Sequence, residues 1–563
     1  MVSSGGSVYS LVRLISVACF ALLLFGKAGV QAQELDNVEE RLRPLEEAER
    51  AARDAKTPFP ETPALHSKDD YEQGKLDRFV LVAVDIKGAT AIPLKEFAPL
   101  YDKLLTTNVT ISDVAALAEN ITALYRKRGY FLSRAIIPAQ DARDGMLKIR
   151  IVEGYIAEVN VEGAGAAQIK DRLSRLTKEK PLRISTLERE LALIGDLNGV
   201  NITAAKIDAF PSEHGRHRLR VNIVKDTFSG SIYADNRGTK DAGPVQTYVS
   251  GAANSALFFG DQLSGGVFFT PFDPDELLLG QAAYSVPIGS HGTELRVSGM
   301  VSTFDAGGPR ASTETESRTH RLIVGISHPV IRLRRTTLWA GVGFEGRNLE
   351  QEAFGTTQFL DKIRSVYASL TLRKALWNGV TGITVKATQG LDMLGASTGG
   401  NLSRSDANGR YTKFNAEVNR LQKLGMKFSA YVSVAGQLSL DPLLSPEEFS
   451  LGGSRYGRAF DYGEYKGDDG FAASVELRYD PGFSVGLLKN LQIYGYHDYG
   501  AVWNDNVAAE FAKRDLSSAG VGVRLLLREK IRLNGEITKP VDGTPYFQGD
   551  KSWRGFFSIS KQF

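Results

Sequence analysis

Residues 365–372 read SVYASLTL, and every second position of this segment is apolar, while serine, threonine or tyrosine stands between. Successive side chains of a β-strand point to opposite faces, so this pattern predicts a strand with one apolar face and one polar face. Similar alternation occurs at residues 293–301, 427–434, 473–479 and 520–526. The chain from residue 228 onward is therefore predicted to consist of many such strands.

Strands of this kind suit a transmembrane β-barrel. Lipid cannot satisfy backbone hydrogen-bonding groups, whereas a closed sheet pairs them all within itself. At roughly ten residues per strand plus turns, residues 228–563 would supply about 16 antiparallel strands, a number that can enclose a water-filled passage. A large soluble β-sandwich or propeller remains an alternative, because alternation alone does not distinguish a lipid-facing surface from a core.

The N-terminus favours export from the cytoplasm. Residues 1–32 contain Arg13, an apolar run at 14–25 and a small-residue exit, which is the pattern of a signal peptide cleaved after Ala32. The run is shorter than the roughly 20 residues of a membrane-spanning helix. Cys19 is the only cysteine and lies in this segment, so the mature chain is predicted to have no disulfide, cysteine-ligated metal or cysteine nucleophile.

The C-terminus ends in a further strand-like segment. Phe557, Ile559 and the terminal Phe563 share one face of it, although Lys561 interrupts that face. A terminal aromatic residue in this setting resembles the assembly signal of bacterial outer-membrane barrels. The formal net charge of +3, with no block of basic residues, gives no indication of nucleic-acid binding.

Two small modules of the order β-α-α-β-β are predicted ahead of the barrel. Residues 77–154 show strands at 79–86, 131–137 and 146–152 and helices near 94–105 and 112–128. Ser112 is the predicted N-cap of the second helix, and Gly129 its left-handed C-terminal residue. The same order repeats in residues 155–227. Each module leaves a sheet edge open, to which a strand of another chain can add.

Short motifs in the first module indicate a family. Tyr125-Arg-Lys-Arg-Gly129-Tyr130, Pro138-Ala-Gln140, Gly145 and Glu153-Gly154 stand at the spacing of polypeptide-transport-associated modules. The chain resembles the two-partner secretion transporters, relatives of the haemolysin and filamentous-haemagglutinin exporters within the Omp85 superfamily. The resemblance implies that the module with Tyr125, Gly129, Tyr130, Pro138 and Gln140 recognises the cargo. Considered by themselves, Gly129, Tyr130 and Pro138 are more directly explained by turns and packing.

Residues 33–76 are predicted to hold an N-terminal helix and a linker. A charged, weakly amphipathic segment at 45–55 is followed by Pro58, Pro60 and Pro63, which stiffen the chain. In the resembling family such a helix occupies the barrel lumen. A solvated or disordered leader remains the alternative, because a short helix this polar is marginal in water.

Residues 451–470 read LGGSRYGRAFDYGEYKGDDG and separate two strand-like runs. By composition, an ordinary solvated loop is as good an interpretation as a functional one. The resembling family has a loop here that folds back into the barrel with a tip of Arg-Gly-Tyr or Arg-Gly-Phe, which implies a tip formed by Arg458, Ala459 and Phe460. Ala459 departs from the family glycine, so either the turn avoids the left-handed conformation or the loop is held less firmly. Supporting turns would come from Gly452, Gly453, Gly457 and Gly470.

A partner for the tip is expected on a later strand. Tyr496, Asp498 and Gly500 share one face and match the aromatic-x-Asp-x-Gly element of the resembling family. If that face lines the lumen, Asp498 can pair with Arg458 through two parallel charge-assisted hydrogen bonds. Gly500 would leave room for the loop.

The resemblance implies an outer-membrane translocator that carries a specific large, β-helix-rich exoprotein from the periplasm to the cell surface, without a cofactor or metal. Expected partners are the exoprotein with its N-terminal secretion domain, outer-membrane lipid and the barrel-assembly machinery. The nearest alternative is an assembly factor that inserts other barrels, which two modules rather than a longer array disfavour. An enzyme is disfavoured because His497 and Asp498 point to opposite faces, and a diffusion porin would not need two modules.

Overall fold

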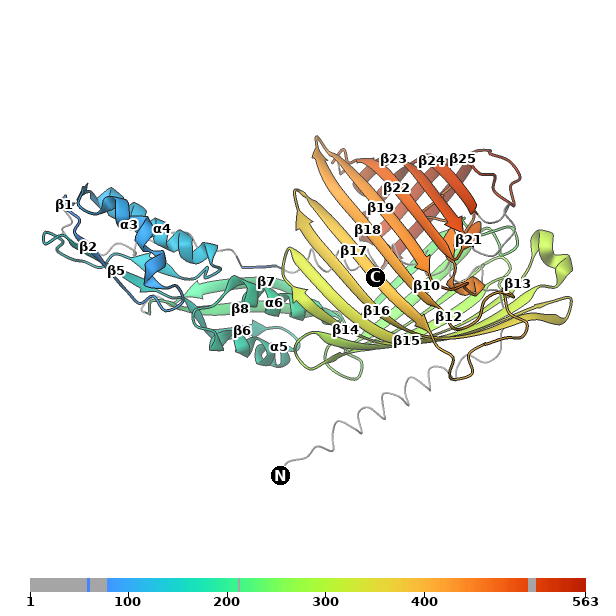
Figure 1. The fold of residues 1–563 in the computed structure, drawn as a ribbon, viewed down its shortest axis with the longest axis horizontal. Helices are drawn as coiled ribbons and strands as arrows, with labels where there is room; N and C mark the ends of the chain where they lie inside the picture. Colours follow the sequence, from blue (N-terminus) through green and yellow to red (C-terminus); the bar gives the residue numbers. More distant parts are fainter. Residues whose placement is uncertain (1–57, 61–77, 211–212, 483, 505–512) are drawn as a thin grey trace, which may run out of the picture. The chain divides into compact units, whose positions relative to one another are not determined.

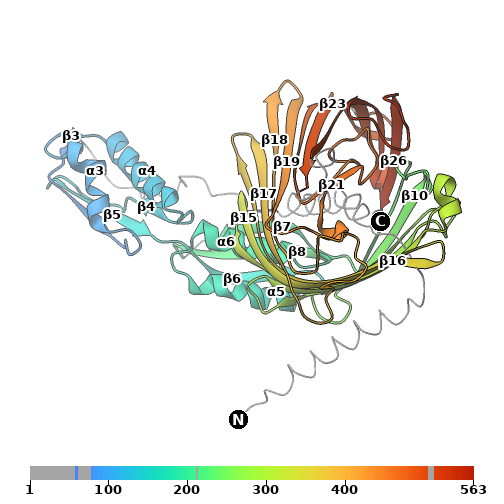
Figure 2. The same ribbon diagram turned by 45° about the vertical axis from the view of Figure 1, so that its right-hand side comes forward.

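The computed structural model describes residues 58–60, 78–210, 213–482, 484–504 and 513–563. The predicted signal peptide and the predicted N-terminal helix lie outside these residues. The chain divides into two compact units, one of residues 227–331 and 335–563 and the other of residues 52–226 with 332–334. Both units are drawn in Figures 1 and 2.

The larger unit is a closed antiparallel β-barrel (Figure 1). Sixteen strands follow one another around the ring in sequence order, and the last strand pairs with the first, which confirms the predicted barrel. The strands are β9 Phe228–Asp235, β10 Gln246–Asn254, β11 Gln262–Phe269, β12 Leu278–Ile288, β13 Thr293–Asp305, β14 Glu316–Arg332, β15 Thr336–Ala353, β16 Thr356–Leu376, β17 Gly379–Gly390, β18 Thr412–Gly425, β19 Phe428–Ser439, β22 Asp469–Tyr479, β23 Leu488–Trp503, β24 Lys513–Leu527, β25 Ile531–Asp542 and β26 Arg554–Gln562.

Closure of the barrel involves the end of the chain. Strand β26 pairs with β9 from Ser558 opposite Asp235 to Gln562 opposite Ser231. Immediately beyond this ladder, the backbone N–H of Phe563 donates a hydrogen bond of 2.9 Å to the carbonyl of Gly230. The terminal residue therefore takes part in the closing pair of strands.

Burial along the strands explains the alternation in the sequence. In β16, Leu370 is 48% exposed, whereas Ser365 is 2% exposed. Exposed apolar side chains recur on the other barrel strands, among them Val342, Val385 and Val418. An outer wall that is apolar and an interior that carries polar groups is the arrangement of a barrel in lipid. Among the helices that the structure describes, none combines the length and apolarity needed to cross a membrane.

The first module of the smaller unit confirms the predicted order of elements but changes their bounds. The predicted strand at 79–86 is split between β1 Phe79–Val80, which pairs with β3 Asn108–Val109, and β2 Ala83–Lys87. A three-stranded sheet has the order β2-β5-β4, with β4 at Arg134–Ile136 and β5 at Met146–Val152. The predicted helix at 94–105 consists of three short pieces, η2 Leu94–Glu96, α3 Ala98–Tyr101 and η3 Asp102–Leu104.

Helix α4, Ile111–Lys127, begins earlier than predicted, so the assignment of Ser112 as its N-cap was wrong. Thr110 is the N-cap, and its hydroxyl accepts a hydrogen bond of 3.3 Å from the Asp113 backbone N–H. The Asp113 carboxylate accepts from the Thr110 backbone N–H at 2.8 Å, which completes a capping box. Gly129 follows the helix with φ of 91°, the left-handed conformation expected of it.

The second module repeats the order of the first. It contains β6 Tyr155–Glu162, α5 Ala166–Leu173, η4 Ser174–Lys178, α6 Ile184–Gly195, β7 Val200–Ala209 and β8 Arg216–Lys225. Its sheet has the order β6-β8-β7, with β6 parallel and β7 antiparallel to β8. In both modules the strand that comes last in the chain lies in the middle of the three-stranded sheet, so the other two are edge strands.

Candidate functional site

The segment between β19 and β22, residues 440–468, forms a folded loop rather than a loose connection. It contains the short helix η6 Ser445–Glu447 and a small hairpin of β20 Phe449–Leu451 and β21 Tyr465–Gly467. The hairpin is in register from Phe449 opposite Gly467 to Leu451 opposite Tyr465. Residues 452–464 are the turn that carries the predicted tip.

Four glycines give this turn its shape. Gly452, Gly453, Gly457 and Gly463 have φ of 102°, 90°, 83° and 71°, a region that favours glycine. A Cβ atom on Gly452 would also lie 2.0 Å from the Asp461 carbonyl oxygen. The backbone of Ala459 does not have a positive φ. The turn therefore avoids the left-handed conformation at Ala459, and Gly457 on the other side of Arg458 adopts it instead.

The structure brings Arg458 and Asp498 together. The Arg458 guanidinium donates to Asp498 through Nε at 3.1 Å and Nη2 at 3.0 Å, and the Arg458 backbone N–H donates to the same carboxylate at 3.1 Å. Asp498 on β23 also accepts from the Ser518 hydroxyl at 3.1 Å. Arg458 is 5% exposed and Asp498 is fully buried, so this bidentate pair is shielded from water.

Further carboxylates of the barrel wall surround the tip. Arg458 Nη1 donates to Glu476 on β22 at 2.9 Å and lies 3.8 Å from Glu536 on β25. Arg524 binds Glu476 at 2.7 Å, and Arg237 forms an ion pair with Glu536. The three carboxylates thus face several arginines, and the charges of this buried cluster are closely matched.

Aromatic and small residues fit the tip against the wall. The Arg458 guanidinium carbon lies 3.2 Å from the centre of the Tyr496 ring, a cation–π geometry. Gly500 faces Leu451, and a Cβ atom there would lie only 2.4 Å from the leucine Cδ2. A Cβ on Gly470 would lie 2.4 Å from the Phe449 ring. Phe460 and Ala459 are buried in an apolar cluster with Leu451, Tyr456, Ala472, Val502 and Leu516.

Replacing Gly520 by alanine is expected to destabilise the barrel by about 1–3 kcal/mol through overpacking. A Cβ atom on Gly520 would lie 2.6 Å from the Tyr496 hydroxyl oxygen and 2.6 Å from the Ile537 carbonyl, whereas Gly535 has no atom within 4 Å of such a Cβ. Gly535→Ala is therefore the control. The unfolding temperature of each variant, read from heat-dependent gel mobility in detergent, measures the effect, and equal values for both would contradict this account.

Several contacts of the loop were missed by sequence reasoning. Arg455 binds Glu417 on β18 at 2.5 Å, and the Tyr456 hydroxyl lies 2.6 Å from that of Ser433 on β19. Arg554 on β26 donates to the Ala459 carbonyl at 2.8 Å. In the sequence, these partners are recognisable only as polar residues on the interior face of a strand. Many other polar residues of the barrel have the same position, so the pattern does not single these partners out.

The predicted cargo-module residues are mostly structural in their contacts. Tyr125 is fully buried, and its hydroxyl donates to Glu153 at 2.8 Å. Tyr130 is 7% exposed, and its hydroxyl accepts from Arg183 of the second module at 3.0 Å. Gly129 accepts at its carbonyl from the Ile184 N–H at 2.9 Å. Tyr130 and Gly129 therefore join the two modules.

Gln140 completes the sheet of the first module. Its side-chain amide donates to the Lys148 carbonyl and accepts from the Lys148 N–H, both at 2.8 Å, so it pairs with β5 as a neighbouring strand would. The amide also donates to the Pro138 carbonyl at 3.3 Å. Pro138 and Gln140 thus shape the end of the β4 side of this sheet.

Glu153 is a half-buried junction between the loop after β2 and helix α4. Burial raises the pKa of its carboxyl, but hydrogen bonds from Thr90, from the Ala91 backbone N–H and from Tyr125 outweigh burial, and the pKa lies below its usual value. Burial together with the hydrogen bond to Glu153 raises the pKa of Tyr125. Both shifts favour the ionised carboxylate beside the neutral phenol.

Acidification is expected to remove the stabilisation that Glu153 provides. Because its folded pKa lies below the unfolded value of about 4.3, the contribution is complete above that value and is lost as the pH falls through the folded pKa. Glu153→Gln should therefore lower the melting temperature of the modules at about pH 6, and this difference should shrink progressively as the pH is lowered below about 4. Glu162→Gln, at an exposed position, is the control. A stability difference that does not shrink on acidification would refute this role.

No group of side chains suited to a metal ion occurs in the described part of the chain. His497 and Asp498 lie on opposite faces of β23, as expected, with His497 exposed and Asp498 fully buried. The neighbouring residues therefore do not combine into an acid–base pair.

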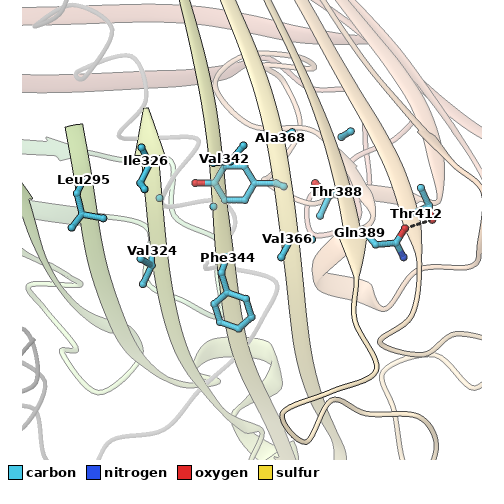
Figure 3. A pocket seen from close by; sticks show the side chains of 14 residues that line it. Leu295, Val324, Ile326, Val342, Phe344, Val366, Ala368, Thr388, Gln389 and Thr412 are labelled. Atoms are coloured by element: carbon cyan, nitrogen blue, oxygen red, sulfur yellow. Dashed lines mark hydrogen bonds between the residues drawn. The ribbon is translucent and has the colours of Figure 1, made fainter. Parts of the chain in front are cut away.

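A depression of about 630 Å³ lies on the wall formed by β13 to β18 (Figure 3). Apolar side chains of neighbouring strands line it, including Leu295, Val324, Ile326, Val342, Phe344 and Val366. At one end Thr412 donates to Gln389 at 2.8 Å. None of the predicted site residues lines this depression. The apolar lining of this depression is typical of a lipid-facing wall. The candidate functional site is therefore the folded loop together with the wall residues that bind it.

Comparisons with known proteins agree with this arrangement. The family model described as haemolysin secretion/activation protein ShlB/FhaC/HecB matches residues 218–525, and the model of the ShlB-type POTRA domain matches residues 79–154. The heme/hemopexin transporter protein HuxB of Haemophilus influenzae strain 86-028NP is 25% identical over 83% of this chain and 84% of its own length. The outer membrane transporter CdiB of Dickeya dadantii is 23% identical, with 91% and 92% covered.

Among solved structures, CdiB from Escherichia coli matches with a TM-score of 0.74 at 19% identity, covering 96% of this chain and all of that chain. CdiB from Acinetobacter baumannii matches with a TM-score of 0.66 at 16% identity. At these identities the structural matches show a shared fold.

Proposed function

The chain belongs to the haemolysin secretion/activation protein family, and from this we propose that it exports one specific large, β-helix-rich exoprotein to the cell surface. It is an outer-membrane transporter of the two-partner secretion type, with its modules in the periplasm. Its relatives are transporters, which favours export over the insertion of other barrels. The exoprotein would carry an N-terminal secretion domain.

The observation that carries this proposal is the loop held inside a closed barrel by the Arg458–Asp498 pair. A barrel of this size can enclose a passage for a polypeptide, and a loop bound to the wall closes such a passage at rest. Release of the tip from Asp498 would then accompany transport. Outward movement needs no nucleotide if the exoprotein folds outside and cannot return.

The periplasmic modules would recruit the unfolded exoprotein. In the described residues β2 pairs only with β5 in its sheet, so the other edge of β2 presents backbone groups that an extended segment can pair with. Because Tyr125 and Tyr130 are buried, their contribution would be to hold the module and its junction in shape.

The proposed organisation along the chain is a signal peptide at 1–32, a helix and linker at 33–76, modules at 77–154 and 155–227 and the barrel at 228–563. Phe563 would serve as the signal read by the barrel-assembly machinery, which is supported by its place beside the closing strand pair.

Deletion of the gene tests the proposed function. We expect one large protein to disappear from the cell surface and the culture medium while other outer-membrane barrels keep their normal levels. Loss of many barrels would indicate an assembly factor instead. An unchanged set of surface and secreted proteins would refute export.

A further inference from the structure

The apolar depression on β13 to β18 lies at the extracellular border of the apolar band of the barrel. Strand β8 of the periplasmic modules ends at Lys225 and β9 begins at Phe228, so the chain enters the barrel from the periplasmic side. Neighbouring strands run in opposite directions, and β16 is the eighth strand of the ring, so it begins at its extracellular end, Thr356. An unbroken outward-facing apolar series on β16 runs from Val366 to Leu372. Because Val366 lines the depression, the depression begins where this apolar series begins.

The small side chains of two alanines leave room for the depression. Ala368 on β16 and Ala387 on β17 lie directly opposite each other in the ladder, and Val342 on β15 lies opposite Ala368. Larger side chains such as Phe344 and Ile326 line the depression beside them (Figure 3). Its volume of about 630 Å³ is within the roughly 300–1,000 Å³ of small-molecule sites in proteins. A hollow of this size in an apolar wall can receive an apolar chain.

Arg364 lies at the extracellular end of this hollow. It precedes Val366 by two positions on β16 and therefore shares its outward face. Its Nη2 donates to the Asn348 side-chain oxygen at 2.8 Å, and its Nη1 donates to the carbonyls of Arg347 at 3.0 Å and Ile363 at 2.7 Å. All three acceptors are uncharged. The Nε–H and one N–H of Nη2 have no acceptor among the described residues, so one edge of the guanidinium can still donate to two oxygen atoms.

A glycine connects this guanidinium to the lining of the depression. Gly346 lies opposite Arg364 in the ladder between β15 and β16. A Cβ atom on Gly346 would lie 3.6 Å from the Phe344 ring and 3.7 Å from the Arg364 Cδ. Because Gly346 has no side chain, the stem of Arg364 and the Phe344 ring border the same gap. The apolar lining and the charged group are therefore adjacent.

Lys362 is the next outward-facing residue of β16 toward the extracellular end. It lies opposite Asn348 in the ladder, and its ammonium group forms no ion pair with any carboxylate of the described residues. The next outward carboxylate on β15, Glu350, lies opposite Leu360 and is therefore farther from the depression. Arg364 and Lys362, called the basic pair below, thus stand at the border of the apolar series without an acidic partner in the described part of the chain.

The position and charge of the basic pair suit a phosphate group. Lipid headgroups lie at the border of the apolar band, and basic side chains there attract anionic headgroups. A guanidinium also matches the geometry of phosphate oxygens. On the β18 side of the depression, Asp441 accepts from the Thr412 backbone N–H at 2.9 Å, and its carboxylate would repel an anion. The phosphate therefore fits on the β16 side.

We propose that the depression binds an acyl chain of a phosphate-bearing lipid of the outer leaflet, and that Arg364 and Lys362 hold its phosphate. The acyl chain would cover Ala368 and Ala387, and two phosphate oxygens would accept from the open edge of the Arg364 guanidinium. Asn348 would keep that guanidinium oriented. This inference concerns the outer wall alone and does not depend on the proposed export function.

The test measures lipid binding to the full-length protein in detergent by native mass spectrometry. The probes are lipid A, which combines phosphate groups with acyl chains, and dephosphorylated lipid A. The parent protein should bind lipid A roughly tenfold more tightly than the dephosphorylated form. Arg364→Gln and Lys362→Gln should each weaken lipid A binding by roughly threefold to tenfold and change binding of the dephosphorylated form little. Ala368→Leu, which fills the hollow, should weaken binding of both forms.

Two variants outside the depression serve as matched controls. Arg420 on β18 is basic and binds Thr381 at 2.6 Å near the periplasmic end of the same wall, so Arg420→Gln should leave lipid A binding unchanged. Ala416 on β18 is exposed but does not line the depression, so Ala416→Leu is the control for Ala368→Leu. Heat-dependent gel mobility shows whether each variant is folded. Lys362→Gln removes no described side-chain contact, so it reports on binding even if Arg364→Gln disturbs the wall.

Equal binding of the two lipids by the parent protein would overturn the role of the basic pair. Displacement of lipid A by inorganic phosphate would show that the acyl chain adds nothing, which would overturn the role of the depression. Lipid A binding that is the same in Lys362→Gln, Ala368→Leu and the parent would overturn the whole inference. A loss confined to the variants of the basic pair and the depression, with both controls unchanged, is the result that supports it.

Discussion

Arg458→Ala is expected to abolish secretion and to release the loop tip from the barrel wall. The substitution leaves the fully buried Asp498 without its guanidinium partner and removes one of the arginines that bind Glu476. Removing one member of a buried pair typically costs about 3–5 kcal/mol. The tip would then be held by the apolar packing of Phe460 and Ala459 and by the hydrogen bond from Arg554 to the Ala459 carbonyl.

A double-mutant cycle with Asp498→Ala checks the pairing. We expect a coupling of about 1–3 kcal/mol in thermal stability, and a double variant that is no worse than Arg458→Ala in secretion. Arg455→Ala is the matched control, because Arg455 lies in the same turn but binds Glu417. Strictly independent effects of the two substitutions on secretion would show that the contact has no functional role.

Release of the tip can be observed directly. Since Cys19 is the only cysteine and lies in the predicted signal peptide, a cysteine placed at Ser454 would be unique in the mature chain. Its labelling by a membrane-impermeant thiol reagent should be slow in the parent protein and faster after Arg458→Ala.

Gly154→Val is expected to prevent secretion while the barrel still assembles. A Cβ atom on Gly154 would lie 2.4 Å from the Leu132 carbonyl oxygen and 2.6 Å from its carbonyl carbon. Such contacts with backbone cannot be relieved by a side-chain rotation, so the cost exceeds the roughly 1–3 kcal/mol of ordinary overpacking. Gly154 also accepts at its carbonyl from the Leu182 N–H at 3.0 Å, which links the two modules.

Gly399→Val provides the control for this substitution, because no atom lies within 4 Å of a Cβ atom at Gly399. Limited proteolysis of the modules and the amount of secreted exoprotein are the two measurements. We expect faster cleavage near the junction and loss of export in Gly154→Val only. Normal export by a variant with a disrupted junction would show that the modules act independently.

The barrel could be predicted because each of its strands is encoded by a local pattern, the alternation of apolar and polar residues. Alternation in segments such as residues 365–372 reflects the two faces of each strand, and the structure shows those faces in the exposure of Leu370 and the burial of Ser365. The first residue of helix α4 could not be predicted, because serine and threonine are both favourable N-cap residues and Thr110 and Ser112 both precede the apolar face of the helix. Only the reciprocal bond with Asp113 distinguishes Thr110.

Contacts across the barrel could be predicted only where a motif pointed to both partners. Arg458 and Asp498 each stood in such a motif, and the structure brings them together. The pairs Arg455–Glu417 and Lys413–Glu447 had no motif. Their geometry depends on the register of several strands and on the path of the loop, which no local pattern encodes.

The pairing of β26 with β9 has a consequence for the order of events in biogenesis. The first barrel strand to be synthesised finds its second neighbour only when the last residues of the chain have been made. Until these two strands pair, each has one unpaired edge that could join other chains. The open barrel therefore needs protection until β26 has paired with β9, and a chain that stops before residue 554 would lack the strand that closes the ring.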